Sequence, residues 1–275
     1  MRVALCNEVL APMEFAKQCD VAAALGYQGL EVAPFTLGGE PLAINAARRA
    51  DIRRAAQDAG IVVSSLHWLL VQPKGLSITS PDATVRARTI AVMRQQIDLC
   101  ADLGGAVLVH GSPAQRRLPD DGQAAARQHG IDAFAAIAAH AGSAGVTYCI
   151  EPLAPPEANF IQTVAQAVAI VQTIDHPSVR TMLDCCAASR AEAETVPDLL
   201  ARWLPTGMLA HIQVNDANLR GPGQGEVGFV DIFRALKRHG YAGWVAVEPF
   251  EYVPDGPGSA ARAIGYIQGL LEALG

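Results

Sequence analysis

The feature that most constrains the fold of this chain is a repeated alternation of strand-like and helix-like segments. Short runs rich in β-branched and other apolar residues are each followed by a longer helical pattern, and eight such units can be counted along the sequence. Near-continuous apolar strands that are separated by helices predict a parallel sheet covered by helices. The expected strands cover residues 2–9, 29–33, 61–68, 106–111, 147–153, 179–184, 209–216 and 244–250.

The expected helices carry start and stop signals of the usual kind. Pro12 opens the first helical pattern and Gly26 closes it, and Gly60 and Gly104 end the next two. A further helical pattern is interrupted by Pro197. The expected helices cover residues 12–25, 43–59, 81–103, about 122–145, 163–174, 192–203, 229–239 and 259–274.

Eight strand-helix units in 275 residues match the size and count of a closed (β/α)₈ TIM barrel, whose active site lies at the carboxyl ends of its strands. We therefore predict an α/β fold with one TIM-barrel domain over residues 1–275. A doubly wound open sheet would normally carry a Gly-rich phosphate turn after its first strand, and residues 6–12 contain no glycine. The closed barrel is the preferred interpretation.

Composition excludes several kinds of partner. A formal charge of −6 and a pI near 5.6 argue against a nucleic-acid partner. No run is long and apolar enough to suggest a membrane partner, and Glu8 interrupts the start too early for a signal peptide. Six cysteines without C-x-x-C spacing suit a reducing compartment. We expect a cytoplasmic protein that acts on a small molecule.

Four oxygen-bearing side chains lie at or near the ends of the last four expected strands: Glu151, Asp184, Gln213 and Glu248. On a barrel they would converge on one open end, called here the mouth. Carboxylates brought that close repel one another unless a cation lies between them, and oxygen ligands suit Mn²⁺, Mg²⁺ or a related divalent ion. The pattern therefore predicts one divalent metal ion per chain.

Several histidines are further candidates. His211 and Gln213 are two residues apart and should share a face, with Gln213 nearer the mouth. We expect Gln213 on the metal and His211 one layer below, as a hydrogen-bond partner, a substrate contact or a core histidine. His67 and His110 end the third and fourth expected strands, where substrate contacts are expected. Trp68 and Phe250 are candidate pocket walls, and Lys74 is a candidate contact for an anionic group.

Several motifs carry a family resemblance. The chain resembles the xylose isomerase-like TIM-barrel superfamily, in particular the sugar phosphate isomerase/epimerase branch that includes the ketose 3-epimerases and hydroxypyruvate isomerase. The resemblance covers most of the chain. The motifs that carry it are Glu151-Pro152-Leu153 with Glu157, Leu183-Asp184, His211-Ile212-Gln213 followed by Asn218 and residues 223–225, and residues 240–243 leading to Val247-Glu248-Pro249-Phe250.

The resemblance implies a function for these residues. Glu151, Asp184, Gln213 and Glu248 would bind one divalent ion, commonly Mn²⁺, with Mg²⁺, Co²⁺ and Zn²⁺ as alternatives. Glu151 and Glu248 would also act as acid and base in an isomerase or epimerase that works through a metal-stabilised enediolate. The substrate would be a sugar, a sugar phosphate or a small hydroxy-keto acid, and Glu157 would contact it. Members of such families often form homo-oligomers, although no residue here specifies one.

Two positions depart from the ketose 3-epimerases. Ala187 stands where those enzymes have a histidine three residues after the metal aspartate, and Leu219 aligns with an arginine of their seventh-strand loop. We therefore expect the metal-binding residues to match those of the ketose 3-epimerases and the residues around the substrate to differ from theirs.

The same barrel can support other functions. A metal-dependent dehydratase or lyase on a keto-sugar or a shikimate-type acid would use the same metal centre and then expel a leaving group. A non-catalytic sugar-binding barrel is a further alternative, and it is disfavoured because four convergent ligands are costly to assemble for binding alone. An abasic-site endonuclease would need additional histidine ligands and a basic surface.

Overall fold

The chain folds into a closed barrel of eight parallel strands, which confirms the predicted TIM barrel. The structure is a computed structural model that describes residues 1–38 and 43–275. Neighbours in the sequence are neighbours in the barrel, and β8 pairs with β1 to close it. The strands are β1 (Arg2–Cys6), β2 (Gly29–Val32), β3 (Val62–Leu66), β4 (Val107–His110), β5 (Thr147–Ile150), β6 (Val179–Asp184), β7 (Leu209–Val214) and β8 (Trp244–Val247).

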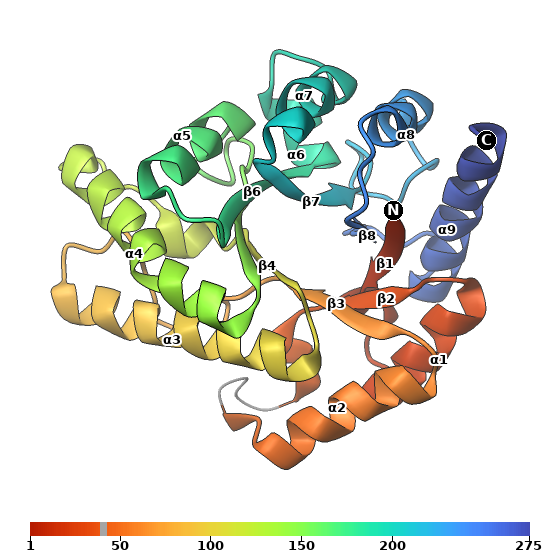
Figure 1. Ribbon diagram of the computed structural model, residues 1–275, viewed down its shortest axis with the longest axis horizontal. Helices are drawn as coiled ribbons and strands as arrows, with labels where there is room; N and C mark the ends of the chain where they lie inside the picture. The colour runs from red at the N-terminus through yellow and green to blue at the C-terminus, as the bar shows by residue number, and fades with distance from the viewer. Residues whose placement is uncertain (39–42) are drawn as a thin grey trace.

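Helices surround the strands as an outer ring (Figure 1). In the described part of the chain, none of them is long and apolar enough to cross a membrane. The α-helices are α1 (Phe15–Leu25), α2 (Ala46–Asp58), α3 (Ala83–Leu103), α4 (Gln123–Ala144), α5 (Val164–Ile174), α6 (Cys185–Ala191), α7 (Val196–Trp203), α8 (Phe229–Arg238) and α9 (Gly256–Ala273). Short 3₁₀ turns follow several strands, among them η1 (Asn7–Leu10), η2 (Pro34–Leu37) and η4 (Pro113–Arg116).

The sequence did not predict helix α6, which begins directly after β6. Asp184 caps it, because its Oδ1 accepts a hydrogen bond of 2.6 Å from the backbone N–H of Ala187. The prediction that Pro197 interrupts a helix was also wrong. Pro197 lies in the first turn of α7, where a missing N–H costs nothing, so the proline helps to start this helix.

Alternation along the strands separates two apolar regions. Val107, Val109, Cys149 and Met182 point into the barrel and pack against one another. The strand residues between them, such as Leu108 and Ile150, point outward and join the large core beneath the helices. The barrel interior is therefore filled rather than hollow, and polar side chains above this plug lie next to the mouth.

Candidate functional site

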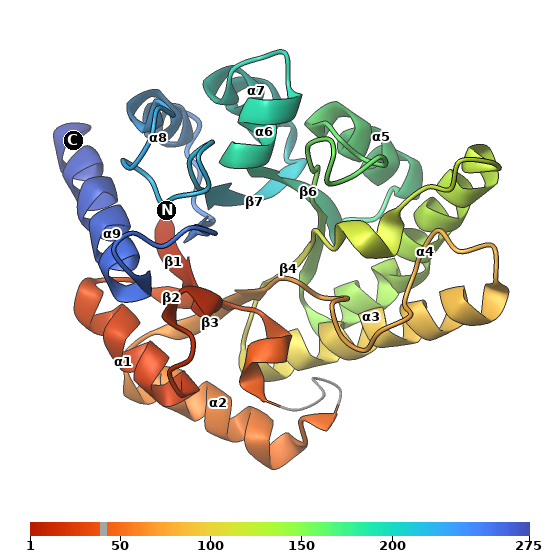
Figure 2. The same cartoon turned by 180° about the vertical axis from the view of Figure 1, so that it is seen from behind.

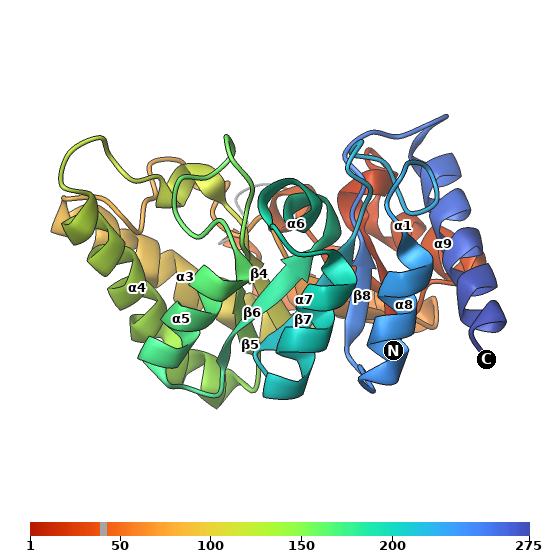
Figure 3. The same ribbon diagram turned by 90° about the horizontal axis from the view of Figure 1, so that it is seen from above.

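A cavity of about 380 Å³ opens at the carboxyl ends of the strands. Figure 2 views the barrel from this side, where α6 and the loops that follow the strands lie, and Figure 3 shows the same loops along one edge of the molecule. The walls of this cavity are mostly apolar, and the polar groups belong to a few side chains. The lining residues are His67, Trp68, Gly111, Ser112, Pro113, Glu151, Leu153, Glu157, Asp184, Cys186, Ala187, Arg190, Leu219, Glu248 and Phe250.

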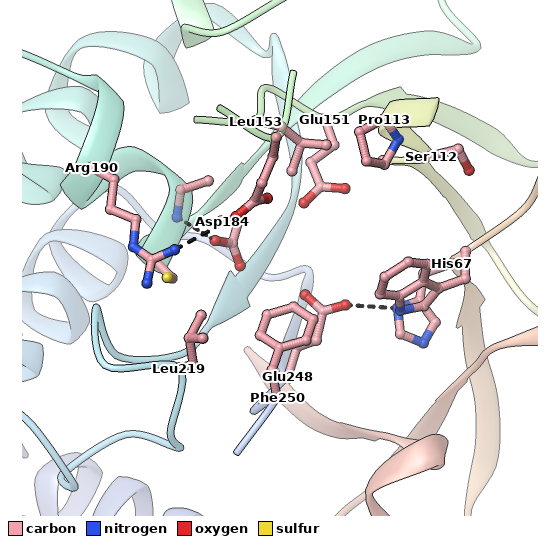
Figure 4. Close-up of a pocket in the computed structure, with 15 residues that line it drawn as sticks. His67, Ser112, Pro113, Glu151, Leu153, Asp184, Arg190, Leu219, Glu248 and Phe250 are labelled. Carbon is pink, nitrogen blue, oxygen red and sulfur yellow. Dashed lines mark hydrogen bonds and ion pairs between the residues drawn. The ribbon is translucent and has the colours of Figure 1, made fainter. Parts of the chain in front are cut away.

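Three carboxylates meet in this cavity. One oxygen each from Glu151, Asp184 and Glu248 lies within 4.8 Å of the other two. All three side chains are buried, and they point toward a common space (Figure 4). Each follows or ends a strand, as expected from the sequence: Glu151 comes after β5, Asp184 ends β6 and Glu248 comes after β8.

The electrostatics of this cluster are unfavourable without a cation. Burial, together with repulsion from Glu248 and Asp184, raises the pKa of Glu151 well above its usual range. Burial also raises the pKa of Asp184 to about 7 and that of Glu248 to about 8. Near neutral pH, protons and a cation would therefore compete for Asp184 and Glu248.

Two buried oxygens in this region have no hydrogen-bond partner among the described residues: Oδ2 of Asp184 and Oε1 of Gln213. Asp184 and Gln213 are register partners on β6 and β7, so they lie side by side. Asp184 uses its other oxygen to cap α6, and Gln213 uses its Nε2 to donate to Glu31 at 2.6 Å. Buried oxygens without partners suggest a missing ligand. Four oxygen donors of this kind fit a hard divalent cation.

Glu31 on β2 anchors a polar layer just below the mouth, and sequence reasoning missed it. Its side chain is fully buried, and it accepts hydrogen bonds from Gln213 and Ser65. Nε2 of His211 lies 2.7 Å from its Oε2. Burial alone would raise the pKa of Glu31, but His211 holds it below its usual range. The sequence feature that could have identified Glu31 is an acidic residue within a short apolar strand.

His67 lines the cavity as expected, but both of its ring nitrogens are already engaged. Nδ1 lies 2.9 Å from Oε1 of Glu248, and Nε2 lies 3.0 Å from Oε2 of Glu8. Burial would lower the pKa of His67, but Glu8 and Glu248 raise it well above its usual range. The contact with His67 fixes the orientation of Glu248, so a direct substrate contact by His67 would require one of these bonds to break.

The expected substrate contacts by His110 and His211 do not fit the structure, since neither is among the described residues that line the cavity. His110 follows the inward-facing Val109 and so points outward, where its Nδ1 lies 2.7 Å from the hydroxyl of Tyr148 and its ring packs on Phe134. His211 points inward but lies fully buried beneath the mouth. Of its expected roles, those of a hydrogen-bond partner and of a core histidine agree with this buried position.

The rest of the wall combines apolar groups with one ion pair. Trp68 and Phe250 form an edge-to-face pair with ring centroids 6.5 Å apart, as expected for apolar walls. Nη1 of Arg190 on α6 lies 3.6 Å from Oε1 of Glu157. Arg190 was missed because α6 was not predicted. Lys74, suggested as an anion contact, is not among the described residues that line the cavity.

Two further residues hold Glu151 in place. Arg116 of η4 is fully buried, and its Nη1 donates to the backbone oxygen of Glu151 at 2.6 Å. Gly111 lies directly against the carboxylate, so that a Cβ at this position would overlap Oε2 of Glu151. The position of Glu151 therefore depends on the absence of a side chain at residue 111.

Comparisons with known proteins agree with the fold. The model of the family described as "Xylose isomerase-like TIM barrel" matches residues 19–270. D-psicose 3-epimerase from Agrobacterium fabrum is 29% identical over 242 residues, which cover 86% of this chain and 80% of that protein. D-psicose 3-epimerase from Ruminiclostridium cellulolyticum is 26% identical, with 83% and 75% covered. A crystal structure of D-psicose 3-epimerase in the presence of D-fructose has a TM-score of 0.84 at 23% identity, covering 98% of this chain and 99% of that one, and so shares the fold.

A substitution at Gly111 separates the position of Glu151 from the stability of the fold. The new Cβ of Gly111→Ala meets the flexible end of Glu151, so the carboxylate should move while the backbone stays. We expect Mn²⁺ affinity, measured by titration calorimetry, to fall about tenfold or more, with little change in the melting temperature of the metal-free protein. Gly228→Ala is the control, because a Cβ there meets nothing within 4 Å. Unchanged affinity in Gly111→Ala would contradict this account of Glu151.

The raised carboxyl pKa values predict how metal binding depends on pH. Protons on Asp184 and Glu248 compete with a cation, so the affinity for Mn²⁺ should rise from about pH 6 to about pH 8, and binding should release protons. Calorimetric titrations at neutral pH in two buffers of different ionisation enthalpy measure this release directly. Binding heats that do not depend on the buffer would show that the carboxylates are already ionised.

Proposed function

The chain belongs to the xylose isomerase-like TIM-barrel family, and on that premise we propose that it is a divalent-metal-dependent epimerase of a ketose. The observation that carries this proposal is the cluster of Glu151, Asp184 and Glu248, together with the unpartnered oxygens of Asp184 and Gln213, beside a cavity of about 380 Å³. Relatives named D-psicose 3-epimerase support carbon 3 of a ketose, the carbon next to the carbonyl, as the reacting centre.

The metal would be held by oxygen atoms of Glu151, Asp184, Gln213 and Glu248, and Mn²⁺ is the ion we propose. A bound divalent cation would supply Lewis-acid polarisation of the substrate carbonyl, which makes the neighbouring C–H more acidic. The protein supplies the remaining elements of the chemistry: it buries the carboxylates, fixes their orientation and surrounds the cavity with apolar side chains that limit access of water.

Glu151 and Glu248 would move the proton. Their carboxylates come from strands on different sides of the mouth and face the shared space from two directions (Figure 4). One would take the proton from carbon 3, which leaves an enediolate, and the other would return a proton to the opposite face, which inverts the carbon. Burial raises the pKa of both groups, and a carboxylate with a raised pKa is a stronger base than one in water.

The wall of the cavity suggests a substrate preference different from that of the named relatives. Ala187 and Leu219 line it at the positions where the family resemblance implies a histidine and an arginine in ketose 3-epimerases. Glu157 and Arg190 are the charged groups that remain on this wall, and their 3.6 Å separation leaves both able to bind hydroxyl groups. We propose that they contact the hydroxyl-bearing tail of the ketose.

Removal of a metal ligand tests the proposal at its first step. The purified protein should carry about one divalent ion per chain, and Asp184→Ala should lose both the ion and the epimerase activity. Gln213→Ala should weaken Mn²⁺ binding more than His211→Ala, because Gln213 lies beside Asp184 with an oxygen that has no partner among the described residues, whereas His211 lies one layer below, next to Glu31. Metal analysis by mass spectrometry measures the occupancy. Full occupancy in Asp184→Ala would refute the assignment.

Paired substitutions test the two glutamates. Glu151→Gln and Glu248→Gln each keep an oxygen that can bind metal but remove the base, so both should bind ketose and fail to turn it over. Each variant should still exchange the carbon 3 proton of one epimer with solvent, and the two variants should exchange opposite epimers. Proton NMR in D₂O distinguishes the epimers. If one variant kept near-normal turnover, a single base would act alone and the two-base epimerase would be wrong.

A further inference from the structure

The carboxylate of Glu31 has no part in the chemistry proposed above, although it is fully buried beneath the metal site. Both of its oxygens are engaged by the layer around it. Oε1 accepts from Nε2 of Gln213 at 2.6 Å, and Oε2 accepts from Oγ of Ser65 and lies 2.7 Å from Nε2 of His211. A carboxylate with both oxygens engaged in this way is poorly suited to bind a metal itself.

The side chain of Gln213 can present either of two chemically different atoms to its surroundings. Its amide has an oxygen that can bind a cation and an NH₂ group that repels one. Because an ionised carboxylate can only accept hydrogen bonds, Glu31 must face the NH₂ group. The amide oxygen is then turned away from Glu31, and it is the atom that is buried without a partner among the described residues.

The register of the strands places the Gln213 oxygen beside the carboxylate cluster. Gln213 is paired with Asp184 across β6 and β7, and Asp184 Oδ2 is likewise buried and without a partner in the described part of the chain. Glu151 and Glu248 complete the cluster from the neighbouring strands. We infer that Glu31 is a positioning residue that fixes the Gln213 amide with its oxygen toward the metal. This inference rests on the proposed function.

A double-mutant cycle separates this role from a general effect of charge or packing. Glu31→Gln keeps the shape of the side chain, but its amide can either accept from or donate to Gln213, so the orientation is no longer enforced. Mn²⁺ affinity measured by calorimetry should fall about 10- to 100-fold, as is usual when a partner that orients a ligand is lost. In the Gln213→Ala background, Glu31→Gln should change the affinity by less than about twofold.

Two more variants complete the experiment. Glu31→Asp keeps the negative charge but withdraws the carboxylate, so it should also weaken Mn²⁺ binding, and it serves in place of Glu31→Gln if that variant does not fold. Ser65→Ala is the matched control: it removes another donor to the same carboxylate while leaving Gln213 in place, and should change the affinity by less than about twofold. Circular dichroism of each metal-free variant checks that the barrel is intact.

The outcomes are distinguishable. Equal losses from Glu31→Gln in the wild-type and Gln213→Ala backgrounds would show that Glu31 does not act through Gln213, and would overturn the inference. Wild-type affinity in both Glu31→Gln and Glu31→Asp would overturn it as well. A wild-type protein that binds no Mn²⁺ would instead contradict the proposed function on which the inference rests.

Discussion

The site depends on one electrostatic constraint, which is that three buried carboxylates converge within 4.8 Å of one another. Such a cluster is unfavourable unless protons or a cation balance its charge. The surrounding groups fix the carboxylates in this arrangement: His67 orients Glu248, Arg116 holds the backbone of Glu151, and the start of α6 fixes Asp184. The repulsion among these carboxylates raises the affinity of the proposed site for a divalent ion. It also makes the carboxylates stronger bases.

Beneath the carboxylates, the barrel is organised in layers. An apolar plug that includes Val109 and Met182 fills the interior. Above it, the buried polar layer of Glu31, His211 and Gln213 separates that plug from the mouth. Buried polar groups of this kind are stable only when nearly all of them are satisfied. In the described part of the chain, both the Gln213 oxygen and Nδ1 of His211 lack a hydrogen-bond partner. The position of the Gln213 oxygen beside Asp184 is accounted for if a metal ion binds there.

Much of the fold followed from sequence pattern, because strand and helix periods differ and Gly and Pro mark their ends. The carboxylates Glu151, Asp184 and Glu248 could be placed for the same reason, since each ends an apolar run. His110 was misplaced because a shift of one residue along a strand turns a side chain to the opposite face. Glu31 and Arg190 were not identified, because their roles depend on contacts between distant strands and on a short helix that the sequence pattern did not reveal.

We propose that this barrel moves a proton at the carbon next to a ketose carbonyl. This proposal is tested most directly by incubating the wild-type protein with Mn²⁺ and D-psicose, D-fructose and other free ketoses in D₂O, and by following each carbon position by NMR. The account predicts deuterium at carbon 3 together with the appearance of the carbon 3 epimer, and loss of both after treatment with EDTA. An aldose product with deuterium at carbon 2, or loss of water from the sugar, would contradict it.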